Sequence, residues 1–347
     1  MVKKNYSIHL GLSILMAQFC VFFPTYAEED CALYKESYEN VQYNCEIVLP
    51  VDFNEDELYR GKVNATYCSD YSKALDVLVQ DKTIVEEQIY PAEGDIPEWR
   101  YYTLEDGTVL GTGDTTFFTT INSYYYEKAF KNIVLEESTD VEQFDFMTVV
   151  ECEKNLNDLL KAIDLNADIA FKNYALNYEI ASAWEEHLAH DGTYDTEGYK
   201  QNWSEEDNAY LIYGYQEFQN LPVYHELMFL GGNMKYLNAD NAVLQAIYTC
   251  GGLQKLQVNY LYDFEIMEEK VKLKSFQEIV NTINLRLNGT IENTMYEVKK
   301  AVLMQMVKHN QVQGYDVLPV WYVEAESQEG ITVILVNAET AEEIFIR

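Results

Sequence analysis

The residues from Thr148 to Ile163 read TVVECEKNLNDLLKAI and have a clear helical pattern. Thr148, followed three residues later by Glu151, forms a capping box, which is a common start signal of a helix. The apolar residues recur at helical spacing and predict one buried face: Val149, Cys152, Leu156, Leu159, Leu160 and Ile163. A second stretch, SFQEIVNTINLRL from Ser275, has the same organisation, with Glu278 as the partner of Ser275. We therefore predict two amphipathic helices.

Each predicted helix is followed by a strand-like segment that contains the tripeptide Leu-Pro-Val. The first copy is Leu221-Pro222-Val223 and the second is Leu318-Pro319-Val320. A proline within a strand favours an edge position or a strand start, because proline donates no ladder hydrogen bond. These patterns predict an α+β fold with two helix-plus-antiparallel-sheet units. The first spans residues 140–268, with an insertion near 170–200, and the second spans residues 269–347.

The region before these units is predicted to be rich in β-strand. Residues 28–40 are polar and are interpreted as a tether. Alternating hydrophobicity from Val41 to Val51 predicts a half-buried strand. Further along, Asp106-Gly107 is predicted to be the turn of a hairpin. We therefore predict a β-rich N-terminal region over residues 41–139.

The first 27 residues have the organisation of a secretory signal peptide. Lys3 and Lys4 precede an apolar run of about 14 residues, which is shorter than the roughly 18–20 that a spanning helix needs. Phe19 precedes Cys20, so a lipobox is absent from the sequence. We predict cleavage after Ala27 and a secreted or cell-surface protein, with an uncleaved anchor as the alternative.

Charge excludes two classes of partner. The chain of 347 residues has 58 acidic and 24 basic side chains, for a formal net charge of -34. Such a chain has no basic stripe to bind nucleic acid and no electrostatic attraction to anionic membranes. Hydrophobic residues make up 48% of the chain, which is enough to form a packed core.

The cysteines are predicted to be structural. An odd number of them remains after signal cleavage: Cys31, Cys45, Cys68, Cys152 and Cys250. A disulfide between two of the first three is compatible with an oxidising compartment. Cys152 and Cys250 lie in apolar surroundings in the sequence and are predicted to be small core residues.

The metal-binding candidates are weak. His187 and His190, with Asp191 adjacent, share one face of a predicted helix, which is compatible with a surface metal site. The alternative is that the histidines are helix C-terminal cations favoured by the macrodipole. His225-Glu226 resembles the start of a zinc-protease motif, but Phe229 replaces the second histidine. We predict no cofactor and only weak binding of divalent cations by the acidic surface.

Tyrosine is unusually frequent, with 29 residues. Amphipathic rings build binding surfaces at interfaces, and the strands around the two tripeptides are the predicted location. The candidate binding residues are Tyr213, Tyr215, Tyr224, Trp321 and Tyr322. The alternative is that these tyrosines lie on half-buried strand faces, where tyrosine is favoured.

Several of these segments resemble known families. The resemblance rests on Phe144-Asp145-Phe146-Met147, on Trp203-Ser204-Glu205-Glu206-Asp207, on both tripeptides, and on the end from Val333 to Ala338. Over roughly residues 140–347 the chain resembles an uncharacterised lipoprotein family of gut Clostridia, and also PepSY-like and Yyc-type regulatory domains of Firmicutes. The resemblance implies an extracytoplasmic α+β protein with no assigned enzymatic activity. PepSY-like relatives act as inhibitors or partners of peptidases and sensor kinases. The missing lipobox and the replacement of a glycine by Glu339 depart from the pattern.

Taken together, these patterns favour a non-catalytic binding or regulatory protein that acts on an extracytoplasmic protein or peptide. We predict no catalytic residue. The alternatives are an extracellular hydrolase that uses carboxylates and a glycan-binding module that uses tyrosine-rich strands. A partner-binding protein is expected to expose an apolar patch or an open sheet edge. A glycan binder is expected to expose coplanar aromatic rings, and a hydrolase a pocket with a carboxylate pair.

Overall fold

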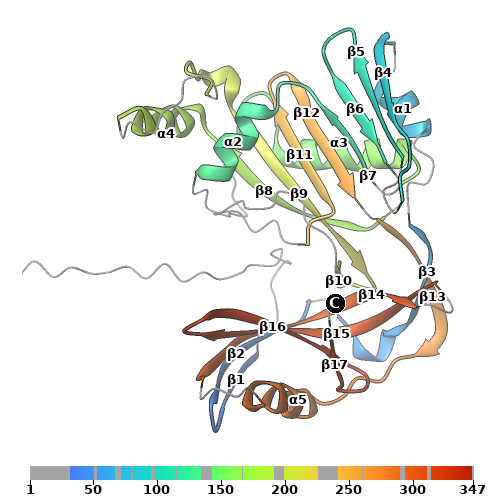
Figure 1. Ribbon diagram of the computed structural model, residues 1–347, viewed down its shortest axis with the longest axis vertical. Helices are drawn as coiled ribbons and strands as arrows, with labels where there is room; N and C mark the ends of the chain where they lie inside the picture. The colour runs from blue at the N-terminus through green and yellow to red at the C-terminus, as the bar shows by residue number, and fades with distance from the viewer. Residues whose placement is uncertain are drawn as a thin grey trace, which may run out of the picture.

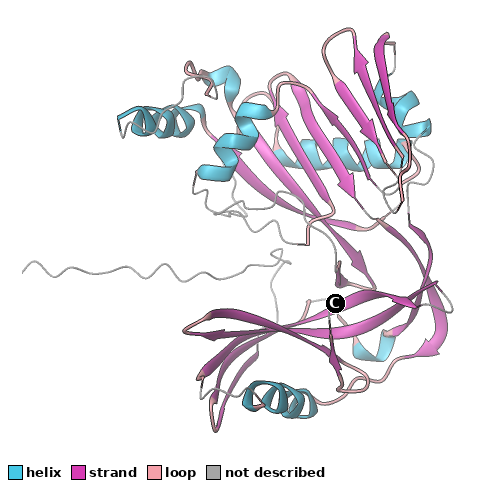
Figure 2. Cartoon of the chain, in the orientation of Figure 1, coloured by secondary structure: helices cyan, strands magenta, loops and turns pink. Residues whose placement is uncertain are grey.

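The chain folds into two β-sheets, which lie one above the other in Figure 1 and are called here the upper and the lower sheet. The computed structural model describes residues 32–50, 53–66, 72–79, 81–94, 98–113, 116–133, 143–165, 167–190, 199–225, 241–259, 261–289, 294–310 and 314–345. Helices flank both sheets (Figure 2). Among the described residues, none of the helices combines the length and the apolar character that crossing a bilayer requires.

The lower sheet is built around a long antiparallel hairpin of β14 (Tyr296–Asn310) and β15 (Gly314–Ser327). Its other strands are β1 (Ala32–Tyr38), β2 (Val41–Val48), β3 (Tyr59–Thr66), β10 (Leu221–Tyr224), β13 (Tyr262–Lys270), β16 (Gly330–Asn337) and β17 (Glu343–Ile344). On its outer side β14 pairs in parallel with β2 and then with β10, whereas β15 pairs with β3 and then with β16. Helix α5 (Phe276–Asn288) packs on this sheet through Ile279, Val280, Ile283 and Leu287.

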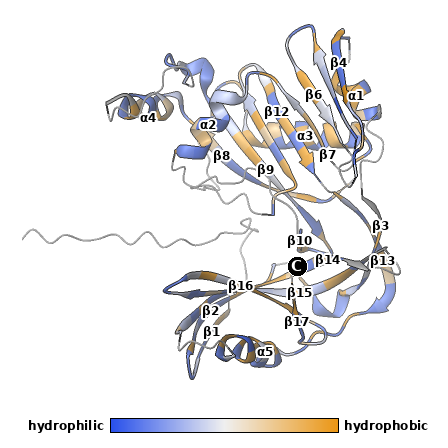
Figure 3. Cartoon of the chain, viewed as in Figure 1, coloured by the Kyte–Doolittle hydropathy of each residue, from blue (hydrophilic) through white to orange (hydrophobic). Residues whose placement is uncertain are grey.

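The upper sheet is antiparallel throughout, in the order β4-β5-β6-β7-β12-β11-β9-β8. Its strands are β4 (Ile84–Tyr90), β5 (Trp99–Leu104), β6 (Val109–Thr112), β7 (Thr116–Thr120), β8 (Ile169–Leu176), β9 (Ala209–Phe218), β11 (Leu244–Thr249) and β12 (Gly252–Asn259). Hydrophobic and hydrophilic residues alternate along many of these strands (Figure 3), so each strand presents different residues to the two faces of the sheet.

Helices cover the two faces of the upper sheet to different extents. On one face, called the α3 face, α3 (Val149–Ala162) and α1 (Ser72–Val79) pack against residues such as Ile212 and Leu256. On the other face, called the α2 face, α2 (Tyr124–Asn132) and α4 (Tyr178–His190) pack against residues of β8, β9 and β11. Glu127 of α2 also reaches β12, where it pairs with the buried Lys255 at 2.8 Å. The described helices therefore leave β6, β5 and β4 without a helix on the α2 face.

The two predicted capping boxes are present. The Thr148 side chain accepts a hydrogen bond from the Glu151 backbone N–H at 3.2 Å, and Glu151 accepts one from the Thr148 backbone at 2.8 Å. Ser275 and Glu278 form the same reciprocal pair at the start of α5. The predicted α+β fold and the predicted turn at Asp106-Gly107 are also confirmed, with Gly107 in the left-handed region at φ 85°.

The boundaries predicted for the N-terminal region are wrong. The predicted tether contains β1, which pairs with β2 from Tyr38↔Val41 to Ala32↔Ile47. The predicted β-rich region is divided between the sheets: β2 and β3 belong to the lower sheet, and β4 to β7 belong to the upper. The physical reason is that β2 and β3 find their partners, β14 and β13, more than 190 residues later in the chain. Local patterns carry no information about such pairings.

The two tripeptides do not occupy the equivalent positions in two repeated units that the sequence had predicted. The second tripeptide lies inside the 14-residue strand β15, whereas the first forms most of β10, a strand of four residues. Val223 of the first tripeptide pairs with Gln305 of β14, and Pro319 of the second pairs with the same Gln305 from the other side. The two tripeptides therefore flank one strand, and β10 links the upper sheet to the lower one.

Pro319 occupies a position where proline costs no ladder hydrogen bond. The outer side of β15 pairs with β3 up to Val317 and with β16 from Val320 onward. Pro319 lies at this changeover, and its carbonyl accepts a hydrogen bond from Ala338 N–H at 2.9 Å. The expectation of an edge-like position for this proline therefore holds locally, although β15 is a central strand.

Candidate functional site

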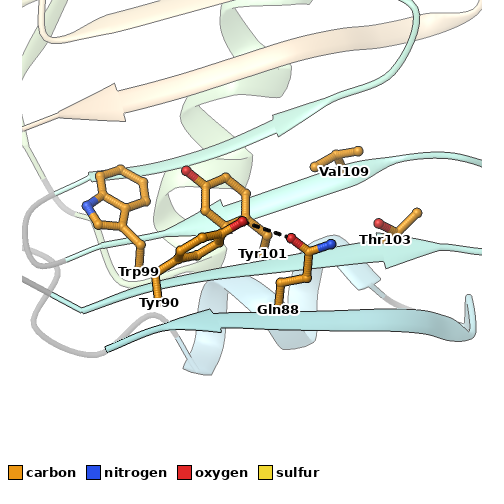
Figure 4. Close-up of a pocket in the computed structure, with 6 residues that line it drawn as sticks. All are labelled: Gln88, Tyr90, Trp99, Tyr101, Thr103 and Val109. Carbon is orange, nitrogen blue, oxygen red and sulfur yellow. Dashed lines mark hydrogen bonds between the residues drawn. The ribbon is translucent and has the colours of Figure 1, made fainter. Parts of the chain in front are cut away.

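A cavity opens on the uncovered part of the α2 face. It has a volume of about 530 Å³ and is lined by Gln88 and Tyr90 of β4, Trp99, Tyr101 and Thr103 of β5, and Val109 of β6 (Figure 4). The ladder register brings these residues together, because Tyr90 pairs with Trp99 and Gln88 with Tyr101. We call this group the aromatic cavity.

The alternation of β5 separates the cavity residues from the core. Trp99, Tyr101 and Thr103 are half-buried and face the cavity. Tyr102 and Leu104 are buried on the other face, where Leu75 and Leu78 of α1 pack against them. A short strand with a different environment on each side thus presents its aromatic rings on the face that α2 does not cover.

The rings of the aromatic cavity form one connected group. The rings of Trp99 and Tyr101 are nearly parallel, with centroids 6.1 Å apart and an interplanar angle of 24°. Tyr90 meets Tyr101 edge-on, with centroids 5.5 Å apart. Aromatic pairs in such geometries contribute more stabilisation than their buried area alone would give, so each ring helps to hold its neighbours in place.

Two glycines, Gly111 in β6 and Gly113 directly after it, make room for aromatic rings on this face. A Cβ on Gly113 would lie 2.7 Å from Cε2 of Trp99, and a Cβ on Gly111 would overlap the ring of Phe118. Gly111 lies inside the sheet, where it pairs with Tyr101 of β5 and Phe118 of β7. Because glycine has no Cβ, an aromatic ring can pack directly on the backbone at each of these two positions.

A chain of polar side chains follows β4 along the same face. The Tyr90 hydroxyl donates to Oε1 of Gln88 at 3.0 Å, and Nε2 of Gln88 donates to Oε1 of Glu86 at 2.8 Å. The six lining residues carry no charge, so the Glu86 carboxylate is the charged group connected to the cavity by these hydrogen bonds.

Strand β4 is an edge strand. Within the described residues it pairs with β5 and with no other strand. All seven of its residues are exposed, among them Val85 at 61%, Tyr90 at 54% and Ile89 at 50%. An edge with exposed apolar side chains is a surface that soluble proteins usually avoid unless it is used.

Three of the predicted binding residues are buried, which corrects their assignment to a surface. Tyr213 and Tyr215 are exposed by 0% and 2%, because α2 and α4 cover this part of the sheet. Trp321 is buried against Phe276 of α5, with ring centroids 5.1 Å apart. Burial raises the pKa of Tyr213 above its ordinary value, as expected for a phenol that has lost contact with water.

Tyr224 and Tyr322 remain partly exposed and lie together. They belong to β10 and β15, on the two sides of β14, and their ring centroids are 6.0 Å apart. Both rings pack against a cluster that includes Met304, Met306 and Val320. The structure thus brings together one pair from the predicted set.

The predicted metal residues are placed only in part. His187 is exposed on α4, which ends at His190, whereas the His190 side chain and Asp191 lie outside the described residues. Among the described residues, no three potential His, Cys, Asp or Glu ligands are gathered at one place.

His225 does not have the environment expected of a metal ligand on a helix. It follows β10, and its ring is buried and stacks on Tyr262, with centroids 5.2 Å apart. Burial lowers the pKa of His225 to about 3, so the imidazole is neutral near pH 7. Neither ring nitrogen has a hydrogen-bond partner among the described residues.

The cysteines divide by exposure. Cys45 and Cys152 are buried and unpaired, and burial raises the pKa of each thiol to about 12. The prediction of a buried Cys250 is wrong: it is exposed, because it lies in the tight turn between β11 and β12. Cys31 and Cys68 lie outside the described residues.

Sequence reasoning missed the aromatic cavity. Its signal was the alternation of Trp99, Tyr101 and Thr103 on a short strand, with glycines at alternate positions of the next one. The pattern of a single strand does not distinguish a face that a helix covers from a face that water covers, so the tyrosines near the tripeptides have the same sequence signal as those of the cavity.

Comparisons with known proteins place the fold but not the function. No family model matches the chain, and no curated protein matches it. A crystal structure of an uncharacterized protein from Eubacterium rectale is similar with a TM-score of 0.57 and 15% identity, over 89% of this chain and 92% of that chain. The C-terminal domain of Bacillus megaterium YpeB aligns with a TM-score of 0.30 and 8% identity, over 79% of this chain and 93% of that chain. The chain therefore has a fold similar to that of the Eubacterium rectale protein, which agrees with the predicted resemblance to uncharacterised proteins at the level of the fold.

Proposed function

We propose that this chain is an extracytoplasmic, non-catalytic binding protein that holds a protein or peptide partner at the free edge of β4. The observation that carries the proposal is the edge itself: a fully exposed strand that pairs only with β5 among the described strands. Unpaired N–H and C=O groups accept an extended chain as an additional strand, and neighbouring side-chain pockets give specificity. The aromatic cavity adjoins this edge.

The extracytoplasmic location is supported by the signal-peptide organisation of residues 1–27. N-terminal sequencing of the protein isolated from the culture medium and the envelope fraction tests it. A mature chain that begins at Glu28 is the expected result. A full-length chain found only inside the cell would contradict this part of the proposal.

Glycan binding is the second candidate, because Trp99 and Tyr101 present nearly parallel rings at the cavity. Sugar rings stack on such surfaces through their apolar faces. The hydrolase alternative gains nothing from the aromatic cavity, whose lining contains no carboxylate. Glu217, whose pKa is raised by burial and by the charge of Asp168, lies on β9 and does not line this cavity.

Affinity capture tests the proposed edge. Residues 28–347 are tagged and incubated with the envelope fraction of the producing cell, as wild type and as the double variant Val85→Lys, Ile89→Lys, because lysines on an edge strand oppose strand addition. Leu285→Lys serves as the matched control, because Leu285 is 78% exposed on α5 of the lower sheet. We expect a protein that wild type and control recover and that the double variant loses by at least about fivefold.

Hydrogen exchange with the recovered partner then locates the contact. The amides of β4 are expected to gain protection, since strand addition ties down outward-facing N–H groups. Identical recovery by all three proteins, or protection confined to the lower sheet, would contradict the proposed edge.

A further inference from the structure

The aromatic cavity has the composition of a site for an organic cation. The faces of the Tyr90, Trp99 and Tyr101 rings carry negative electrostatic potential, which attracts an ammonium or guanidinium group within about 6 Å of a ring centroid. None of the six lining residues is cationic. The position that a positive charge would take is therefore not occupied by a residue of the lining.

A carboxylate stands at the rim of this cavity. Glu86 pairs with Thr103 across the ladder and accepts a hydrogen bond from Gln88 at 2.8 Å, so it lies on the cavity side of β4. The nearby cations are paired elsewhere: Arg100 with Glu98 and Lys82 with Asp106, each at 2.8 Å. Glu86 thus places a negative charge one hydrogen bond away from Gln88, a residue of the cavity lining.

We infer that the aromatic cavity receives a lysine or arginine side chain of an extended peptide that adds to β4; the inference rests on the proposed function and names the chemistry of the partner. A strand added to an edge lies about 4.8 Å from it. Its alternate side chains then fall on the α2 face, next to Gln88 and Tyr90. The aliphatic stem contacts the rings, and the cationic end approaches Glu86.

Charge and hydrogen bonding favour this occupant over two others. The chain has a net charge of -34, so a second copy of it is repelled, whereas a cationic partner is attracted at long range. A glycan would also need hydrogen-bond partners, and Gln88, whose side chain is the one amide of the lining, already bonds to Glu86 and Tyr90.

Calorimetric titration of the mature chain at low salt tests the inference. The probes are acetylated peptides of alternating threonine and valine with a central lysine, and counterparts with norleucine or glutamate in its place. We expect the lysine peptide to bind about tenfold more tightly than the norleucine peptide. The glutamate peptide is expected to bind most weakly, and the lysine preference should decrease as salt is added.

Two charge-matched variants separate the cavity from the overall charge. Glu86→Gln is expected to lower the affinity for the lysine peptide about threefold. Glu87→Gln makes the same change in charge one residue along β4, opposite Tyr102 and so on the other face, and is expected to change it less than twofold. Trp99→Leu is expected to abolish the preference for lysine over norleucine, with the far-UV circular dichroism spectrum checking that the sheet is retained.

Each contrary result has a distinct meaning. Equal affinity for the lysine and norleucine peptides would overturn the cation site and leave edge binding intact. No binding of any of the three peptides at millimolar concentration would overturn both the inference and strand addition at β4. Binding of maltohexaose or cellohexaose that Trp99→Leu abolishes, without peptide binding, would assign the cavity to glycans and overturn the inference.

Discussion

The α2 face of the upper sheet has a covered half and an open half, and both are rich in aromatic residues. In the covered half, on β8, β9 and β11, Tyr213 is exposed by 0%. In the open half, Tyr90 is exposed by 54% and lines a cavity with Trp99. Both halves consist of antiparallel strands with aromatic side chains on this face, and their exposure differs because α2 and α4 cover only one half. An aromatic side chain on a strand becomes core or binding surface according to what lies above it.

A polar network fixes α2 and α4, the two helices that cover this half of the sheet. Asp207 accepts hydrogen bonds from the Tyr126 hydroxyl of α2 at 3.2 Å, from Lys200 Nζ at 2.5 Å and from the Ser204 backbone at 2.9 Å. Glu185 of α4 accepts from the backbone N–H groups of Lys200 and Gln201, each at 2.9 Å. Buried carboxylates that satisfy several donors fix the position of the segments they join.

The largest expected difference between the halves is in stability. Tyr213→Ala should lower the free energy of unfolding by about 3–5 kcal/mol, because it leaves a cavity under α2. Tyr90→Ala should lower it by less than about 1 kcal/mol, since the side chain is already in contact with water. Urea unfolding of the two variants measures both values. Similar losses in both would show that the halves do not differ in packing.

Acid should weaken the packing of α2 and α4 on the sheet before it affects the open half. Burial alone would raise the pKa of Asp207, but the hydrogen bonds from Lys200 and Ser204 and the Lys200 charge outweigh it, and the pKa is lowered. A lowered native pKa contributes stability above the unfolded value near 3.8, and this contribution is lost as the pH falls below it. Asp207→Asn should cost about 2 kcal/mol at pH 7 and should reduce the difference in stability between pH 7 and pH 3. An unchanged pH profile in the variant would exclude Asp207 as its source.

Two glycines sharpen the contrast between a closed and an open environment. A Cβ on Gly214 would lie 2.8 Å from both Ile169 Cγ2 and Leu244 Cβ in the packed α3 side. Gly214→Ala should therefore cost about 1–3 kcal/mol. Gly113→Ala meets only the Trp99 ring within 3.0 Å, which is half-buried and can move outward, so we expect a loss below about 1 kcal/mol together with a changed near-UV spectrum. A larger loss for Gly113→Ala than for Gly214→Ala would indicate that the aromatic cavity is as rigid as the core.

The smallest effect is chemical rather than energetic. Cys250 is exposed in a turn, whereas Cys152 is buried on α3 with a raised pKa. A thiol reagent applied to the native protein should label Cys250 and leave Cys152 and Cys45 unmodified until denaturant is added, as peptide mass spectrometry would detect. Rapid labelling of Cys152 in the native state would mean that α3 does not close that face of the upper sheet.

The candidate site could be predicted from the sequence only in its parts. The alternation of Trp99 and Tyr101 and the turn at Asp106-Gly107 are local features, and the structure has both. The register that sets Tyr90 beside Trp99 is also short-range, because β4 and β5 are consecutive strands. The assignment of Tyr213 and Tyr215 to a surface was wrong because their burial depends on α2 and α4, which single-strand periodicity cannot locate.

Local sequence patterns were enough to predict the starts of α3 and α5, the hairpin turn at Asp106-Gly107, the alternating burial of β2 and the excess of acidic residues. These features follow from hydrogen bonds and side-chain periodicity within a few residues. The folded chain was needed to show that β2 pairs with β14, that β3 pairs with β13 and that both tripeptides meet at Gln305. It also decided which half of the α2 face stays open. Such pairings depend on the burial of surfaces contributed by distant segments, and no local pattern specifies which segments those are.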